Sequence, residues 1–182
     1  MPDFDEESRV RSRDGIGGRV PPHSADAEES LLACCLIDGG DTLTMARTSG
    51  ITPDSFYDPA HRVIFEMLGV MTVDGKPIDV VVLAEELHTA SLLDAVGGAV
   101  RLSRIADRQP TTANRSYFLE QVKTLHGLRE VIKASTSAIE KAYQFQGAPQ
   151  DLVTELNNVS SSLLSIKEPE SFAKSVDRTI EV

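Results

Sequence analysis

Two prolines, a serine and a run of acidic residues mark the first helix start in this chain. Residues 20–32 read ValProProHisSerAlaAspAlaGluGluSerLeuLeu. Ser24 is a favoured N-cap residue, and the acids that follow it complement the positive end of a helix dipole. Apolar residues then recur at helical spacing until Gly39–Gly40. The stretch therefore predicts a helix that must bury one face against neighbouring helices.

Similar signals for the start and end of a helix recur along the first 110 residues. Asp58–Pro59 places a cap residue before a proline at the first helical position, and Asp79 precedes another apolar run. Glycines separate the segments. No stretch has the alternating pattern of a strand, because Val80-Val81-Val82 is too short and follows a cap. The sequence predicts an all-α fold with a compact helical head over residues 21–110.

The pattern changes after Pro110. Thr111 or Thr112 is expected to cap a long helix that runs to about Gln146, where Gly147-Ala148-Pro149 breaks it. In the next helix, apolar residues are spaced four, three, four and three apart, which is the period of a coiled-coil seam. Two helices around a short turn predict an antiparallel helical hairpin over residues 111–168. The candidate partner-interface positions are Phe118, Val122, Leu125, Tyr143, Leu152, Val153, Leu156, Val159, Leu163 and Leu164.

Two interpretations of this seam stay open, namely packing inside the hairpin and contact with another subunit. A two-helix hairpin cannot cover both of its faces, so Val153 and Leu164, beside the seam, are candidates for intermolecular contact. Beyond Pro169 the chain predicts an amphipathic linker helix over residues 169–182. Its apolar stripe either docks in a groove of a neighbour or frays. The stripe consists of Phe172, Val176 and Ile180.

The charge balance is acidic, with 28 Asp and Glu against 18 Lys and Arg. This disfavours general wrapping of a nucleic-acid backbone, which needs a basic footprint. Arg101, Arg104 and Arg108 share one face of a predicted helix and form a possible basic patch. The patch has two interpretations: a site for single-stranded DNA or an acidic partner, and a solvated face with local acids such as Asp107.

Other polar residues are expected to be structural. No pair of histidines has the spacing of a metal site, so His61 is expected to bond locally at its helix start. The pairs Glu28–Glu29 and Glu85–Glu86 are expected on solvated faces. Cys34 and Cys35 are expected to be buried free thiols of a cytoplasmic protein. With no phosphate-binding loop, the chain is predicted to have no catalytic, metal-binding or cofactor-binding residue.

Two segments bear on localisation. The first twenty residues mix acids with arginines and glycines and lack the apolar core of a secretion signal, so a disordered leader is expected. No stretch approaches the roughly 18 apolar residues of a membrane span. The sequence therefore predicts no contact with a membrane.

Five blocks in consistent order resemble the N-terminal domain of DnaB-type replicative DNA helicases. The likeness covers about residues 20–168. The blocks are ProProHisSer with AlaGluGluSerLeuLeu, PheTyrAspProAlaHisArgValIlePhe at 56–65, GlyLysProIleAspValValValLeuAlaGluGluLeu at 75–87, ValGlyGlyAlaValArgLeu at 96–102 and ThrThrAlaAsnArgSerTyr at 111–117.

The resemblance implies a helical collar in which copies of the chain form either a dimer or a ring of six, the ring being a trimer of dimers. It also implies that the hairpin docks primase or the helicase loader, and that the linker helix packs on the adjacent motor domain. ATP and Mg would belong to that motor domain of a full-length parent helicase, which is expected to meet single-stranded DNA only as a complete ring at the nucleoid. The alternatives are a stand-alone adaptor or inhibitor that mimics the collar, and the helicase-binding domain of a primase.

Overall fold

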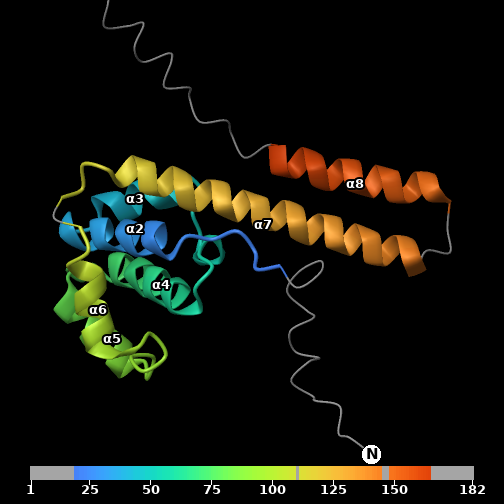
Figure 1. The fold of residues 1–182 in the computed structure, drawn as a ribbon. Coiled ribbons are helices and arrows are strands. Elements are labelled where there is room, and N and C mark those ends of the chain that lie inside the picture. The colour runs from blue at the N-terminus through green and yellow to red at the C-terminus, as the bar shows by residue number, and fades with distance from the viewer. Residues whose placement is uncertain (1–18, 110, 145–147, 165–182) are drawn as a thin grey trace, which may run out of the picture. The chain divides into compact units, whose positions relative to one another are not determined.

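The computed structural model describes residues 19–109, 111–144 and 148–164, apart from several side chains in the last helix. Within these residues every regular element is a helix and no strand occurs (Figure 1). The all-α class predicted from the sequence is confirmed. The helices are α2 (Ala25–Ile37), α3 (Asp41–Thr48), the 3-10 helix η2 (Pro53–Ser55), α4 (Pro59–Val73), α5 (Val80–Thr89), α6 (Gly98–Ala106), α7 (Arg115–Gln144) and α8 (Pro149–Leu164).

Three helices begin at the caps that the sequence predicts. The Ser24 hydroxyl accepts a hydrogen bond from the Ala27 N–H at 3.2 Å, which starts α2. The carboxylates of Asp58 and Asp79 accept in the same way from the second residue of α4 and of α5, at 2.8 and 2.7 Å. Side-chain acceptors at these positions satisfy N–H groups that have no partner inside the helix.

The start of α7 differs from the expectation. Thr111 and Thr112 do not cap the helix directly; they belong to a turn that precedes Arg115. The Thr111 hydroxyl accepts from the Ala113 N–H at 3.3 Å, and the Thr112 carbonyl accepts from the Arg115 N–H at 3.0 Å. Threonine hydroxyls also stabilise such turns, so the sequence located the connection but placed the helix start two or three residues too early.

The hydrophobic core lies among α2, α3, α4, α5, α6 and the first half of α7. α2 packs on α3, α4 and α6, and nearly all its side chains from Ala27 to Cys35 are buried. Helix α5 closes the core through contacts with α4 and α6. Residues that lie within the core include Leu31, Leu32, Phe56, Ile64, Leu68, Leu83, Leu87, Leu102, Ile105, Leu119 and Val122.

The chain divides into two compact units within α7. Residues 20–129 form one unit, and the part of α7 from Glu130 onward belongs with α8 to the other. The first unit therefore includes the start of α7 together with α2 to α6. The reason is that Leu119 and Val122, on the first turns of α7, complete the head core with exposed fractions of 3% and 1%.

Both cysteines are buried free thiols, as the sequence predicts. Burial raises the pKa of the Cys34 and Cys35 thiols, and the nearby Asp38 carboxylate raises both pKa values further. A thiol held in its protonated form is a poor nucleophile. Among the helices of the described residues, none is both long and apolar enough to cross a bilayer.

Candidate functional site

A buried polar cluster joins α2 to the start of α4. Glu28 is only 3% exposed. Its carboxylate accepts hydrogen bonds from the Tyr57 N–H at 2.7 Å and the Asp58 N–H at 3.3 Å, and it lies 2.8 Å from the Nδ1 of His61. The expectation that Glu28 is solvated is therefore wrong. The backbone that leads into α4 has N–H groups with no hydrogen-bond acceptor inside the helix. The Glu28 carboxylate is the acceptor for two of them.

His61 sits at the centre of this cluster and is fully buried. Its Nε2 lies 3.2 Å from the Nη2 of Arg101. Because a guanidinium only donates, Nε2 acts as the acceptor, and the ring proton is on Nδ1, which donates to Glu28. The sequence suggested a local bond for His61, whereas its shortest contact reaches α2, and the local Asp58 carboxylate lies 3.8 Å away.

Asp58 connects the α4 cap to α6. Its carboxylate accepts from the Ala60 N–H and, at 2.6 Å, from the Nη2 of Arg101. Burial would raise the pKa of the Asp58 carboxyl, but the hydrogen bonds from Arg101 and Ala60, with the nearby positive charge, hold its pKa below the ordinary value. The ionised form is thereby stabilised at the point where α4 and α6 meet.

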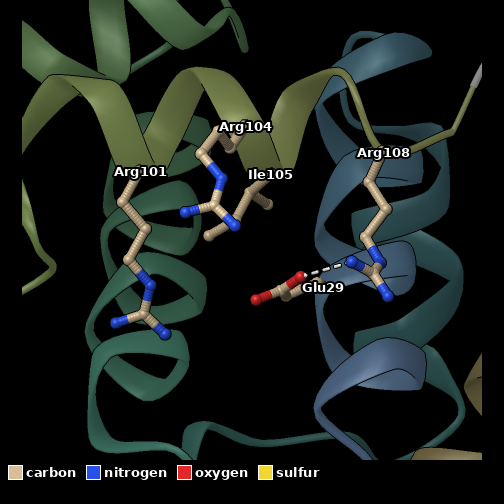
Figure 2. Close-up of a pocket in the computed structure, with 5 residues that line it drawn as sticks. All are labelled: Glu29, Arg101, Arg104, Ile105 and Arg108. Carbon is tan, nitrogen blue, oxygen red and sulfur yellow. Dashed lines mark ion pairs between the residues drawn. The ribbon is translucent and has the colours of Figure 1, made fainter.

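A small pocket opens on the side of α6 that carries Arg101. It has a volume of about 120 Å³ and is lined by Glu29, Arg101, Arg104, Ile105 and Arg108, which we call the arginine pocket. Figure 2 shows the three arginine side chains directed to one side of α6, with Glu29 between Arg104 and Arg108. Residues 101, 104 and 108 share this face because they are three and four positions apart on a helix. The structure thus brings the predicted basic patch together.

The acids that neutralise the arginine pocket come from other helices. Arg101 pairs with Asp58, and the Nη1 of Arg108 lies 2.9 Å from the Glu29 carboxylate, while its Nη2 pairs with Asp26. Asp107, the acid expected from the sequence, forms no ion pair within the described part of the chain. Arg104 likewise has no carboxylate partner among the described residues.

A second hollow of about 360 Å³ lies between α3, η2 and α4 and is largely apolar. Sequence reasoning missed it, because the groove is made by side chains from three separate segments. Its lining includes Ile51, Pro53, Phe65, Val70 and Val73.

Arg129 anchors the first half of α7 to the head. Its guanidinium donates to the carbonyl oxygen of Pro22 at 3.0 Å and to that of Ser55 at 2.6 Å. It also lies 5.9 Å from the centre of the Tyr57 ring, which stacks on His23 at 4.1 Å. This anchor was not predicted, because its partners are distant in sequence and two of them are backbone oxygens.

The predicted hairpin interface divides between core and surface. Val122 lies in the head core and is therefore covered within this chain, while Phe118 packs against that core and Leu125 is half-buried. Tyr143 and Val153 are exposed, at 89% and 55%, and Leu152 is half-buried. Further exposed apolar residues of α7 are Leu128 in the first unit and Val131, Ile132 and Ile139 in the second.

Several of the expected interface and linker positions lie outside the residues or side chains that the structure describes. Leu156, Val159, Leu163 and Leu164 belong to α8, but their side chains are not among those described. Phe172, Val176 and Ile180 lie outside the described residues, as does the leader up to residue 18. Within the residues described, no group of three or more His, Cys, Asp or Glu side chains is arranged to hold a metal ion.

The sequence of this chain is similar to a known family and to two curated helicases. Residues 20–124 match the model of the DnaB-like helicase N terminal domain. The replicative DNA helicase DnaC of Bacillus subtilis is 29% identical over 168 residues, which are 92% of this chain and 37% of that protein. The replicative DNA helicase DnaB of Geobacillus stearothermophilus is 32% identical over 125 residues, 69% of this chain and 27% of that protein. The chain thus spans about a third of the length of these curated relatives.

Solved structures give the same result. The crystal structure of the N-terminal domain of DnaB helicase from Mycobacterium tuberculosis superposes with a TM-score of 0.70 at 29% identity, covering 79% of this chain and 99% of that one. A structure of a DnaB-like replicative helicase and its interactions with primase has a TM-score of 0.60 at 18% identity and covers 87% of this chain and 35% of that one. The latter supports the fold alone.

Proposed function

Since this chain belongs to the DnaB-like helicase N-terminal domain family, we propose that it forms the collar of a replicative DNA helicase ring. In this role the chain does no chemistry. It holds copies of itself together and presents docking sites for partner proteins. ATP hydrolysis with Mg, and contact with single-stranded DNA in the cytoplasm, belong to the full-length ring.

The apolar surface of α7 beyond the compact head is the observation that carries this proposal. Exposed apolar side chains recur along α7 from Val131 to Tyr143, and Val153 adds another on α8. Water-exposed apolar groups in such a row favour association, because burying each one contributes roughly 1 kcal/mol or more. We expect α7 and α8 to form an antiparallel hairpin, two hairpins to pair through this surface, and three such dimers to close a ring.

Ring geometry also explains how partners are recruited. Several weak docking sites held close together raise the effective concentration of a bound partner. The relative with the TM-score of 0.60 is a helicase described with its interactions with primase. We propose that primase, or a helicase loader, docks on the hairpin end that carries Tyr143. The segment 169–182 is proposed to pack on the neighbouring motor domain through Phe172, Val176 and Ile180.

Self-association is tested by placing a charge in the row. Ile139→Asp puts a carboxylate at an exposed apolar position of α7, and Val81→Asp is the matched control on the exposed face of α5. Light scattering after size-exclusion chromatography, over a range of concentrations, is expected to show assembly for the parent chain and the control. Ile139→Asp is expected to shift the equilibrium to monomer. A parent chain that stays monomeric throughout, or a control that dissociates equally, contradicts the proposal.

A further inference from the structure

We propose that the arginine pocket binds the carboxylate of a glutamate side chain from a protein partner. The site is distinct from the apolar surface of α7, since its lining comes from α2, α6 and the residues just after α6. Binding at this pocket can therefore be tested separately from ring assembly. Three features favour this ligand: the unused hydrogen-bond donors of Arg104, the exchangeable ion pair of Arg108, and the size of the pocket.

Arg104 supplies the unused donors. Arg101 is engaged by Asp58 at 2.6 Å and by the ring of His61, and both contacts fix its guanidinium. Arg104 is exposed, has no ion pair among the described residues, and points with its neighbours toward one side of α6 (Figure 2). Because a guanidinium has five N–H donors and no acceptor, Arg104 offers a planar fork to an incoming carboxylate.

Arg108 supplies a second, exchangeable contact. It pairs with Glu29, which is 23% exposed, and with Asp26, whose side chain is 85% exposed. An ion pair with so exposed a partner contributes little to stability, so an incoming carboxylate can replace Asp26 at small cost. Glu29 then remains as the internal acceptor on the pocket wall, and the entering group lies beside Arg104 and Arg108.

The volume and lining favour one glutamate side chain. About 120 Å³ is well below the roughly 300–1,000 Å³ of pockets that hold whole small molecules. It is enough for a single carboxylate and its methylene groups. Ile105 provides an apolar contact for those methylenes, while the arginines meet the charged end. Arginines in small pockets at protein surfaces are frequent sites of strong binding energy in interfaces.

Charge argues against a nucleic-acid ligand. Asp26, Glu29 and Asp58 adjoin the three arginines, so the positive and negative charges balance locally although Arg104 has no ion pair among the described residues, and the whole chain has a net charge of −10. A phosphate backbone would place further negative charges beside these acids, and one uncompensated arginine releases few counterions. A peptide needs to bring only one carboxylate into the pocket and can leave its other groups uncharged.

Titration of the full chain with short peptides, followed by NMR of the arginine Nε–Hε groups, tests the site. The probe is a blocked GlyAlaGluAlaGly peptide, and GlyAlaGlnAlaGly is its uncharged match. We expect saturable shifts at Arg104 and Arg108 with the first peptide and none with the second. Arg104→Ala should abolish the Arg108 shift, and Arg104→Lys should weaken binding about fivefold, because the charge stays but the fork is lost.

Arg47→Ala is the matched control, because Arg47 is an exposed arginine that lines the other hollow. It should bind the glutamate peptide as the parent chain does. Equal shifts with the glutamine peptide, loss of binding in Arg47→Ala, or tighter binding of an oligothymidine than of the peptide at the same salt concentration would overturn the proposal. Circular dichroism and the melting temperature show that each variant is folded, so a missing shift in Arg104→Ala reports on the pocket.

Discussion

At the scale of the residue, Glu28 shows how one buried carboxylate joins separate segments of the head. Moving an ionised group out of water is costly unless it is paired and fully hydrogen-bonded. Glu28 meets this condition with two backbone N–H groups and the Nδ1 of His61. The same contacts fix α2 against the first turn of α4 and hold the His61 ring toward Arg101.

Glu28→Ala is expected to lower the free energy of unfolding by about 3 kcal/mol, because three donors in a buried site lose their acceptor. The neighbouring Glu29→Ala should cost less than about 1 kcal/mol, since Glu29 is partly exposed and its pair with Arg108 is screened by solvent. Urea denaturation at neutral pH measures both values. Similar losses in the two variants would contradict the role assigned to Glu28.

Asp58 predicts a particular dependence of stability on pH. Its pKa in the folded chain is lower than the ordinary 3.8, so its stabilising contribution is complete well above pH 3.8 and is lost as pH falls through the folded pKa. Asp58→Asn should therefore flatten the acid side of the stability profile. Asp54→Asn, at an exposed position nearby, should leave the profile unchanged. Denaturation midpoints between pH 7 and pH 3 decide whether the two variants differ in this way.

Local chemistry explains which of these residues the sequence could predict. The caps at Ser24, Asp58 and Asp79 depend on residues two or three positions away, so their roles can be inferred from a short stretch. Glu28 and Glu29 look equivalent in sequence, yet on a helix they point about 100° apart and meet different neighbours. The bonds from Glu28 to His61 and from Arg101 to Asp58 join residues 33 and 43 positions apart, which periodicity does not reveal.

At the scale of the element, α7 changes its environment along its length. Leu119 and Val122 are buried in the head, whereas none of the described side chains from Lys123 onward in α7 is buried. The sequence predicted the helix and nearly its end, Gln144 against an expected Gln146. It did not predict the change of environment, because apolar residues continue at the same spacing through both halves.

Gly127 lies inside this helix, and no neighbouring atom requires a glycine there. A Cβ built at Gly127 meets no atom within 4 Å, so Gly127→Ala should stabilise the chain by roughly 1 kcal/mol, through the higher helix propensity of alanine. Gly69→Ala in α4 is the control. A Cβ there would lie 3.0 Å from the Nη1 of Arg47, which must shift, so the gain should be smaller. Thermal unfolding compares the variants, and a larger gain at Gly69 would contradict this reasoning.

At the scale of the whole molecule, the buried core is confined to one of the two compact units. All buried residues of the described chain lie between Ala27 and Val122, within the unit of residues 20–129. The unit ends at Arg129, the residue whose side chain is tied to Pro22 and Ser55. Because opening free energies follow local burial, the two units should differ in stability.

Hydrogen exchange measured by mass spectrometry is expected to show this difference. In dilute samples, amides of α2 should exchange far more slowly than those of α8. Raising the protein concentration should slow exchange in α8 and in residues 130–144 if copies pair there, while α2 provides the internal control that stays unchanged. Equal protection of α2 and α8 in dilute samples would show that burial is a poor guide to stability in this chain.

The sequestered pair of thiols has a practical consequence. Cys34 and Cys35 are the chain's whole complement of cysteine, and both are shielded from solvent with a raised pKa. Alkylating dyes and spin labels act on accessible thiolates and should pass over both native sites. A single new cysteine on the outer surface would then be the one point of attachment, and distances between tagged copies become measurable in the otherwise unaltered chain.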